Sequence, residues 1–178
     1  MASEHIIIKR LESAAEDQVS GFRLSETDDQ PLKTFIRREA WKSAQASITQ
    51  TYVAKFESQP QVIAYITLMC AEIKLDDGYS IADKESVNRY IFQPAVRIAR
   101  LACADGYQRM GLGRKLVELA IGLAKAAIMP NVGCRFIILD AKQKSVEFYQ
   151  KLGFRLLETK SNRLSHNPVM FMDLRNGG

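Results

Sequence analysis

The stretch from Ala95 to Arg114 constrains the fold more than any other part of the chain. It reads as an apolar strand, a short polar turn and a glycine-containing loop that opens a helix. That order puts backbone N–H groups at a helix N-terminus, where proteins often hold a phosphate. Because Gly111 and Gly113 have no side chains, a ligand can approach the main chain closely there. The sequence therefore predicts an anion site, and we expect it to hold the pyrophosphate of a cofactor.

Length and composition favour one domain, residues 1–178. The chain has 178 residues, of which 47% are hydrophobic, and this is enough for a core, although two very small domains stay open. No apolar run reaches about 18 residues, and the N-terminus lacks the pattern of a secretory signal. We therefore expect a soluble, intracellular protein in the cytoplasm, with no membrane partner. The net charge of +5 fits phosphate or RNA ligands, but an ordinary basic surface explains it equally well.

Cysteine and histidine usage argues against a metal centre. Cys70, Cys103 and Cys134 are widely spaced in apolar, strand-like segments, which is typical neither of a disulfide framework nor of a zinc site. His5 and His166 stand in a terminal segment and a turn-like segment, so neither is a good partner for a nucleophilic thiol. We expect free thiols and no resident metal.

Hydrophobic periodicity predicts the remaining elements. The predicted strands cover residues 6–11, 51–56, 62–69, 94–103, 136–139, 154–157 and 169–172. Three helices are predicted. The first begins at Pro31, the second begins at Leu112, and the third covers residues 143–152 and ends with Gly153 as a left-handed C-cap. A turn is expected at 76–78, followed by a polar excursion to residue 89. This order predicts an α/β (α+β) fold, in which a mixed central sheet is flanked by helices.

Two motifs indicate the chemistry. Gln108-Arg-Met-Gly-Leu-Gly113 has neither the three glycines of the dinucleotide fingerprint nor the Gly-Lys-Ser/Thr of a Walker loop. Ser145-Val-Glu-Phe-Tyr-Gln-Lys-Leu-Gly-Phe154 follows about 35 residues later. Together they resemble the GCN5-related N-acetyltransferase (GNAT) family, and the best-matched core is 96–157. The resemblance implies an acyltransferase that moves an acetyl group from acetyl-CoA to a primary amine by direct transfer.

A closer likeness exists within that family. Ile98-Ala-Arg-Leu-Ala102, the Gly-Leu-Gly loop, the Phe148–Phe154 motif and the strand at Thr51–Val53 look like the toxin acetyltransferases of bacterial toxin–antitoxin pairs. Those toxins acetylate the amino group of aminoacyl-tRNA, so the resemblance implies that acceptor and an antitoxin partner. Two active sites framing one RNA would suit so large a substrate, so a homodimer is expected as well. A small-molecule or protein N-acetyltransferase and a non-catalytic acyl-CoA-binding module are the alternatives.

The resemblance also implies roles for individual residues. Main-chain groups of Leu101, Ala102 and Cys103 would meet the pantetheine arm and the thioester carbonyl. Tyr149 matches the family tyrosine that faces the sulfur, and its phenol would protonate the leaving thiolate as the catalytic general acid. The pyrophosphate would be held by Arg109, Met110, Gly111, Leu112, Gly113 and Arg114.

The acceptor amine has less stringent needs. A free α-amine has a pKa of about 7.7–8.0 and an aminoacyl ester a lower one, so a dedicated base is dispensable. Glu72 is the one candidate base that the sequence offers.

Several of these residues also have structural interpretations. Tyr149 can be an ordinary core aromatic, and Cys103 reads better as a small apolar filler than as a nucleophile. Arg97 and Arg100 either steer an anionic substrate or are simply exposed on the strand. Three further basic residues lie on the outer side of the first helix, where they either contact RNA phosphates or are merely solvated. These residues are Arg37, Arg38 and Lys42.

Overall fold

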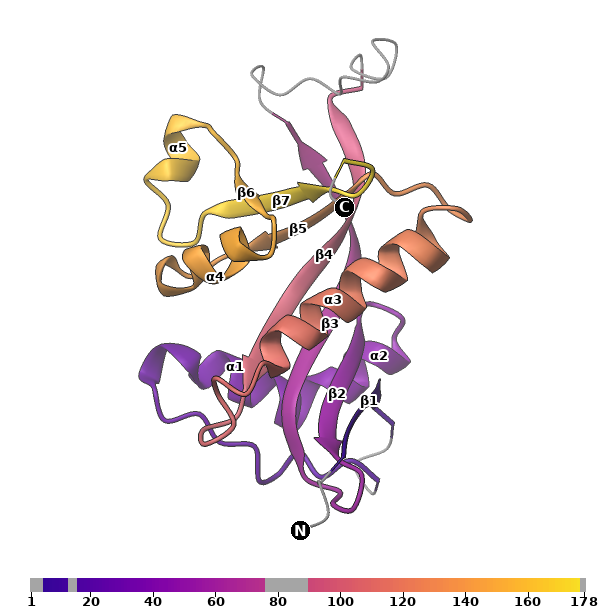
Figure 1. The fold of residues 1–178 in the computed structure, drawn as a ribbon, viewed down its shortest axis with the longest axis vertical. Helices are drawn as coiled ribbons and strands as arrows, with labels where there is room; N and C mark the ends of the chain where they lie inside the picture. Colours follow the sequence, from indigo (N-terminus) through magenta and orange to yellow (C-terminus); the bar gives the residue numbers. More distant parts are fainter. Residues whose placement is uncertain (1–4, 13–15, 76–89, 177–178) are drawn as a thin grey trace. The chain divides into compact units, whose positions relative to one another are not determined.

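The computed structural model describes residues 5–12, 16–75 and 90–176. Seven strands form one mixed sheet in the order β1-β2-β3-β4-β5-β7-β6, with helices beside it, which confirms the predicted fold class (Figure 1). The chain divides into two compact units, Met1–Met69 with Ala99–Ala120 and Cys70–Ile98 with Ile121–Gly178. No helix in the described part is both long and apolar enough to cross a membrane.

The first unit contains the N-terminal strands and the predicted anion loop. It holds β1 (Ile6–Arg10), β2 (Gln50–Phe56), the first part of β3 (Val62–Lys74), the end of β4 (Phe92–Cys103) and most of α3 (Leu112–Leu123). Its helical segment consists of a 3-10 turn (Thr27–Asp29), α1 (Gln30–Thr34), a π-helical turn (Phe35–Glu39) and α2 (Ala40–Gln45). β2 pairs antiparallel with β1 and with β3, so the two predicted strands at 51–56 and 62–69 form a hairpin.

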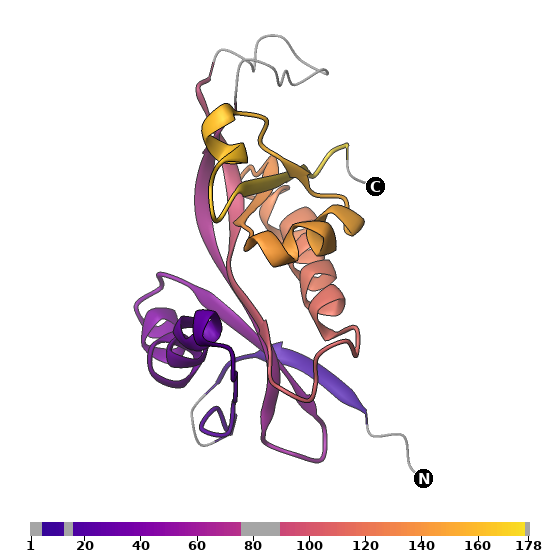
Figure 2. The ribbon, with the colours of Figure 1, turned by 90° about the vertical axis from the view of Figure 1, so that its left-hand side faces the viewer.

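The helical segment lies on one side of β2 and β3 within this unit (Figure 2). Phe35 and Ile36 are buried, so one face of this amphipathic segment lies in the core. The ring of Phe35 stacks on that of Tyr65 at 6.3 Å, and the Tyr65 hydroxyl donates to the Leu32 carbonyl at 2.8 Å. An aromatic pair of this kind contributes about 0.5–1.5 kcal/mol beyond its area burial. The segment is therefore held in a fixed position on β3.

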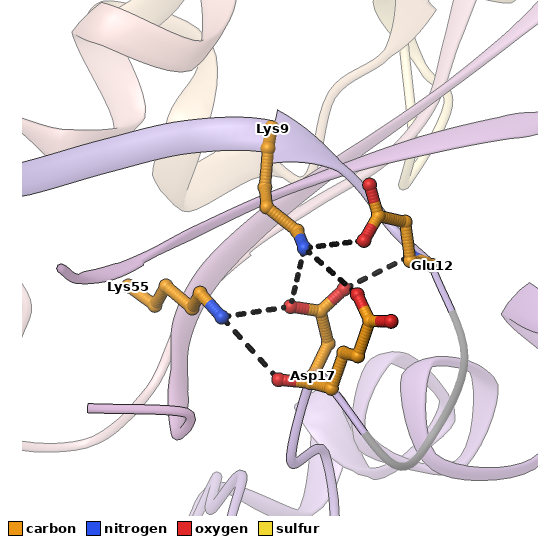
Figure 3. A network of polar contacts seen from close by, with 5 residues as sticks. Lys9, Glu12, Asp17 and Lys55 are labelled. Carbon is orange, nitrogen blue, oxygen red and sulfur yellow. Dashed lines mark hydrogen bonds and ion pairs between the residues drawn. The ribbon is translucent and has the colours of Figure 1, made fainter. Parts of the chain in front are cut away.

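A buried carboxylate ties β1 and β2 to the chain that follows β1 (Figure 3). Asp17 is fully buried, and its carboxylate lies 3.4 Å from Lys9 and 3.2 Å from Lys55. It also accepts the backbone N–H of Glu12 at 2.9 Å. The hydrogen bond from Lys9 to Glu12 raises the pKa of Lys9 above its usual value. The sequence analysis did not single out this network.

The second unit has its own core under the C-terminal strands. Its elements are β5 (Phe136–Asp140), a 3-10 turn (Gln143–Ser145), α4 (Val146–Lys151), β6 (Arg155–Leu156), α5 (Lys160–Arg163) and β7 (Val169–Asp173). A π-helical turn (Ala124–Ile128) extends α3. In this unit β5 pairs in parallel with β4 and antiparallel with β7. Its core is built from Ile73, Ala95, Phe136, Ile138 and Phe171.

Three details differ from the sequence predictions. β3 continues to Lys74 instead of ending at residue 69, and β6 is only two residues long. The polar loop before β7 contains α5, which was not predicted. The Thr159 hydroxyl caps this helix by accepting the N–H of Asn162 at 3.2 Å, and the buried Asn162 amide donates to Leu157 and Val169. The expected turn at 76–78 and the excursion to 89 lie outside the described residues.

Candidate active site

The predicted anion loop joins β4 to α3 within the first unit. Two backbone hydrogen bonds fix the start of the loop. The Ala104 N–H donates to the Ile63 carbonyl at 2.8 Å, and the Tyr107 N–H donates to the Ala104 carbonyl at 3.0 Å. At its far end the Leu112 side chain is buried, which anchors the first turn of α3 in the core. Only the backbone of Leu112 is therefore offered to a ligand. The loop between these anchors is exposed.

Backbone conformation explains one of the loop glycines. Gly111 has φ of 78°, and a Cβ built on it would meet no atom within 4 Å. Glycine is thus needed at 111 for its left-handed conformation, while the open space leaves the main chain accessible to a ligand. Arg109 has φ of 64°, a conformation that costs a residue with a side chain about 1–2 kcal/mol. Strain of this kind is often found at ligand sites.

The electrostatics of the loop favour an anion. The first turn of α3 contains no acidic residue, and the helix is 12 residues long, so its N-terminal partial charge is not neutralised locally. Arg109, Arg114 and Lys115 are exposed around it. Arg114 reaches Glu118 at 3.6 Å, which is a weak exposed pair. The loop can therefore present both N–H groups and cations to a phosphate.

The end of β4 adjoins this loop. Burial raises the pKa of the Cys103 thiol to about 11, and a backbone hydrogen bond from Gly113 offsets part of this rise. Cys103 is therefore protonated at neutral pH, which agrees with a filler and not with a nucleophile. Ala102 is buried, and Leu101 and Cys103 are half-buried. The parallel register of β4 with β5 covers Ala95–Ile98, so it uses no peptide group of 101–103.

Tyr149 lies in α4 of the second unit, and its spacing from Gly153 has a geometric cause. Gly153 has φ of 91°; its N–H donates to the Gln150 carbonyl at 2.9 Å, and the Phe154 N–H donates to the Tyr149 carbonyl at 3.1 Å. This bond pair is a Schellman cap, in which the residue after the glycine contacts the last helical turn. The rings of Phe154 and Tyr149 accordingly meet edge to face at 5.8 Å. The Phe-Tyr-x-x-x-Gly-Phe motif therefore fixes the orientation of a largely buried Tyr149.

The other candidate residues have mixed outcomes. Glu72 is exposed on β3. Arg97 forms an ion pair with Asp140, and the guanidinium of Arg100 lies 5.0 Å from the centre of the Phe35 ring. Both arginines thus have structural partners.

The cysteines partly follow the sequence expectation. All three are free. Cys70 is exposed on β3 and Cys103 is half-buried at the end of β4, so both lie in strands as predicted, whereas the buried Cys134 lies in the segment before β5. Strand type could be read from the local pattern, but which face of β3 meets solvent depends on its neighbours. Within the described ranges, no three His, Cys, Asp or Glu residues are grouped to hold a metal.

Comparison with known proteins now identifies the family. The family model described as "Acetyltransferase (GNAT) family" matches residues 11–154, which include the glycine loop, Tyr149 and parts of both compact units. The chain belongs to the acetyltransferase (GNAT) family. The predicted family and enzyme class are confirmed. A curated GNAT relative, N-alpha-acetyltransferase 50 of Danio rerio, is 31% identical over 71 residues, or 39% of this chain. The match spans 41% of that relative's length.

Solved structures share the whole fold. One is AtaT complexed with acetyl-methionyl-tRNAfMet, with a TM-score of 0.80, 22% identity and 96% of each chain covered. Another is a tyrosine-to-phenylalanine mutant of the toxin AtaT bound to acetyl-CoA and the C-terminus of the antitoxin AtaR. Its TM-score is 0.73, at 22% identity, with 96% of this chain and 94% of that chain covered. These similarities show that the GNAT fold of this chain extends well beyond the predicted core 96–157.

Proposed function

We propose that residues 1–178 act as one acetyl-CoA-dependent N-acetyltransferase domain that transfers acetyl directly to a primary amine. The observation that carries this proposal is the exposed loop between β4 and α3, in which Arg109 and Gly111 are left-handed and which leads into a first helical turn without acidic residues. Membership of the GNAT family supplies the reaction class. The AtaT mutant bound to acetyl-CoA supports the choice of donor.

The cofactor residues fit this donor. Main-chain N–H groups from Arg109 to Gly113, with the guanidinium groups of Arg109 and Arg114, hold the pyrophosphate. The open space at Gly111 is where the phosphates approach the backbone. Peptide groups of Leu101, Ala102 and Cys103, which the register with β5 does not use, bind the pantetheine amides and orient the thioester. Acetyl-CoA itself supplies the acetyl group as an activated thioester.

Tyr149 is the general acid in this mechanism. The neutral amine attacks the thioester carbonyl carbon, the carbon–sulfur bond breaks, and the Tyr149 hydroxyl donates its proton to the leaving sulfur. The proton lost by the amine passes to solvent and the phenol is reprotonated, which closes the proton balance. The Schellman cap supports this role because it fixes the ring. No base is needed, so the exposed Glu72 takes no part.

The acceptor that we propose is the amino group of aminoacyl-tRNA. AtaT complexed with acetyl-methionyl-tRNAfMet shares the fold over 96% of this chain, and it supports an RNA-borne α-amine. An antitoxin partner and a homodimer belong to the same proposal, the former supported by the AtaT–AtaR complex. The alternative acceptor is a protein N-terminus, which the match to N-alpha-acetyltransferase 50 favours. Both acceptors are α-amines with pKa values of about 8 or below.

Transfer of radiolabelled acetyl from acetyl-CoA to total aminoacyl-tRNA, compared with a library of N-terminal peptides, tests the acceptor. We expect label in RNA; label only in peptides would reject the tRNA acceptor in favour of the alternative. Binding of CoA without transfer to any amine would reject the enzyme.

The variant Tyr149→Phe tests the general acid. We expect it to lower kcat about 100-fold, at the low end of general-acid effects because thiolate is a fair leaving group, while acetyl-CoA affinity stays unchanged. Tyr52→Phe, which removes a hydroxyl from half-buried β2, is the matched control. Equal kcat for both variants would remove Tyr149 from the mechanism.

A further inference from the structure

An open pocket of about 350 Å³ lies in the first unit, on the outer side of the helical segment. Its lining consists of Gln18, Val19, Ser20, Arg37 and Arg38. None of these residues belongs to the loop or the strand end assigned to acetyl-CoA. The pocket is therefore separate from the acetyl-CoA site proposed above.

Both walls of the pocket are held in place by contacts with the unit's core. Arg37 and Arg38 follow the buried Phe35 and Ile36 in the π-helical turn, so the turn is anchored while both guanidinium groups stay at the surface. On the other wall, the Gln18 N–H donates to the Pro60 carbonyl at 2.9 Å, and its carbonyl accepts from Val62 at 3.0 Å. π-Helical turns are rare and are frequently found at functional sites. The two arginines are therefore presented by a rigid frame.

The charge on this face is uncompensated. Residues 30–45 contain four cations and one acid, Glu39. Among the described residues, neither Arg37 nor Arg38 forms an ion pair. The acids just before Gln18 are already engaged, since Asp17 lies between Lys9 and Lys55 and Glu16 lies near Lys9. Two exposed guanidinium groups that line one pocket, without acidic partners among the described residues, suit the charge and hydrogen-bonding capacity of a phosphate.

We infer that this pocket is a backbone-phosphate subsite for the RNA acceptor, so the inference rests on the proposed function. Lys42 and Trp41, which is 38% exposed, continue the same face into α2. A partly exposed tryptophan offers a surface on which a base can stack. The acceptor proposed above is an RNA, which supplies phosphates for the cations and bases for the ring, so RNA is the occupant that we assign.

The same helix contacts the strand that is assigned to the thioester. Arg100 immediately precedes Leu101 in β4, and its guanidinium lies over the Phe35 ring at 5.0 Å. Phe35 in turn lies two residues before Arg37. RNA held at the pocket is thus fixed to the same unit as the main-chain groups of 101–103. The subsite would position the acceptor without taking part in the chemistry.

Binding of unfractionated tRNA, followed by fluorescence anisotropy between 50 and 200 mM salt, tests the subsite. The variant Arg37→Gln/Arg38→Gln should bind at least about tenfold more weakly, and its slope of log K against log salt should fall in magnitude by about 1.4–1.8, as expected for two lost phosphate contacts. The control Lys160→Gln/Arg163→Gln removes the same charge from exposed α5 and should bind like the wild type. Acetyl-CoA affinity and the unfolding midpoint verify the fold of both variants.

The outcomes separate the subsite from the proposed reaction. An unchanged slope in the Arg37→Gln/Arg38→Gln variant, or an equal loss in the control, would overturn the subsite. A wild type that binds labelled polyglutamate but not tRNA would overturn the subsite in favour of an acidic protein partner. If the wild type binds tRNA through these arginines but acetylates no aminoacyl-tRNA, the subsite stands and the proposed acceptor fails.

Discussion

Replacing Gly153 with alanine tests whether the cap of α4 is under the backbone constraint that we assign to it. At φ of 91°, an L-residue is strained by about 1–2 kcal/mol. The new Cβ would also lie 3.3 Å from the Cε of Met172, so that methyl group must move by a few tenths of an ångström. Alanine restricts the unfolded chain and thereby offsets about 0.4–1 kcal/mol of the cost. We expect a net loss of about 1 kcal/mol in the free energy of unfolding.

Gly122 provides the matched control, because it is an exposed glycine inside α3. Its φ is outside the left-handed region, and a Cβ there would meet no atom within 4 Å. Gly122→Ala should therefore stabilise the protein by about 0.5–1 kcal/mol, through helix propensity alone. Replacing glycine with alanine is thus expected to lower the free energy of unfolding at position 153 and to raise it at position 122.

Urea unfolding of both variants measures this difference. The Gly153→Ala midpoint should fall and the Gly122→Ala midpoint should rise at equal m-values, and the Tm of Gly153→Ala should fall by about 2–4 °C. Because the cap orients Tyr149, Gly153→Ala should also lower kcat more than it changes the KM for acetyl-CoA. A Gly153→Ala protein as stable as Gly122→Ala would refute the reasoning.

Four other predictions rest on contacts and backbone conformations described above. With a pKa of about 11, the half-buried Cys103 thiol is almost wholly protonated at pH 8, so Cys103 should alkylate much more slowly than the exposed Cys70. The folded Cys103 thiol binds its proton more tightly than the unfolded one, so its contribution to stability is full below pH 9 and is lost between pH 9 and about 11; Cys103→Ala should flatten that part of the profile. Asp17→Asn leaves two lysines around a buried site and should destabilise by about 1–3 kcal/mol in urea unfolding, whereas exposed Glu16→Gln should cost less than about 0.5 kcal/mol. Gly111→Val should weaken acetyl-CoA binding in calorimetry, since valine resists φ of 78°; unchanged affinity would place the phosphate elsewhere.

The elements around the candidate site were predictable because their signals are local. The start of α3 and the left-handed Gly153 follow from apolar spacing and from glycine placement within a few residues. The left-handed conformation of Gly111 was not predicted, because φ could not be read from the sequence, and its role in cofactor binding stays a prediction. The helix α5 was missed because it has only four residues and no apolar period. Its stability comes from the side chains of Thr159 and Asn162.

Polar partners were not predictable, because they join residues far apart in the chain. Asp17 lies in a polar run that reads as surface, yet it is buried between Lys9 and Lys55, which strand pairing brings together. The pocket between residues 18–20 and the two arginines has the same origin. The sequence singled out Arg37 and Arg38 but left open whether they are merely solvated.

By itself, the sequence determined the order of strands and helices, the glycine loop and the two motifs that identify the family. It could do so because helix and strand periods, and the backbone freedom of glycine, act over a few residues. Only the tertiary structure decided which charges are buried and paired, which thiols are exposed, and which arginines remain available to a ligand. Those properties depend on sheet register and on the packing of the helical segment against β3, and both are set by contacts between distant parts of the chain.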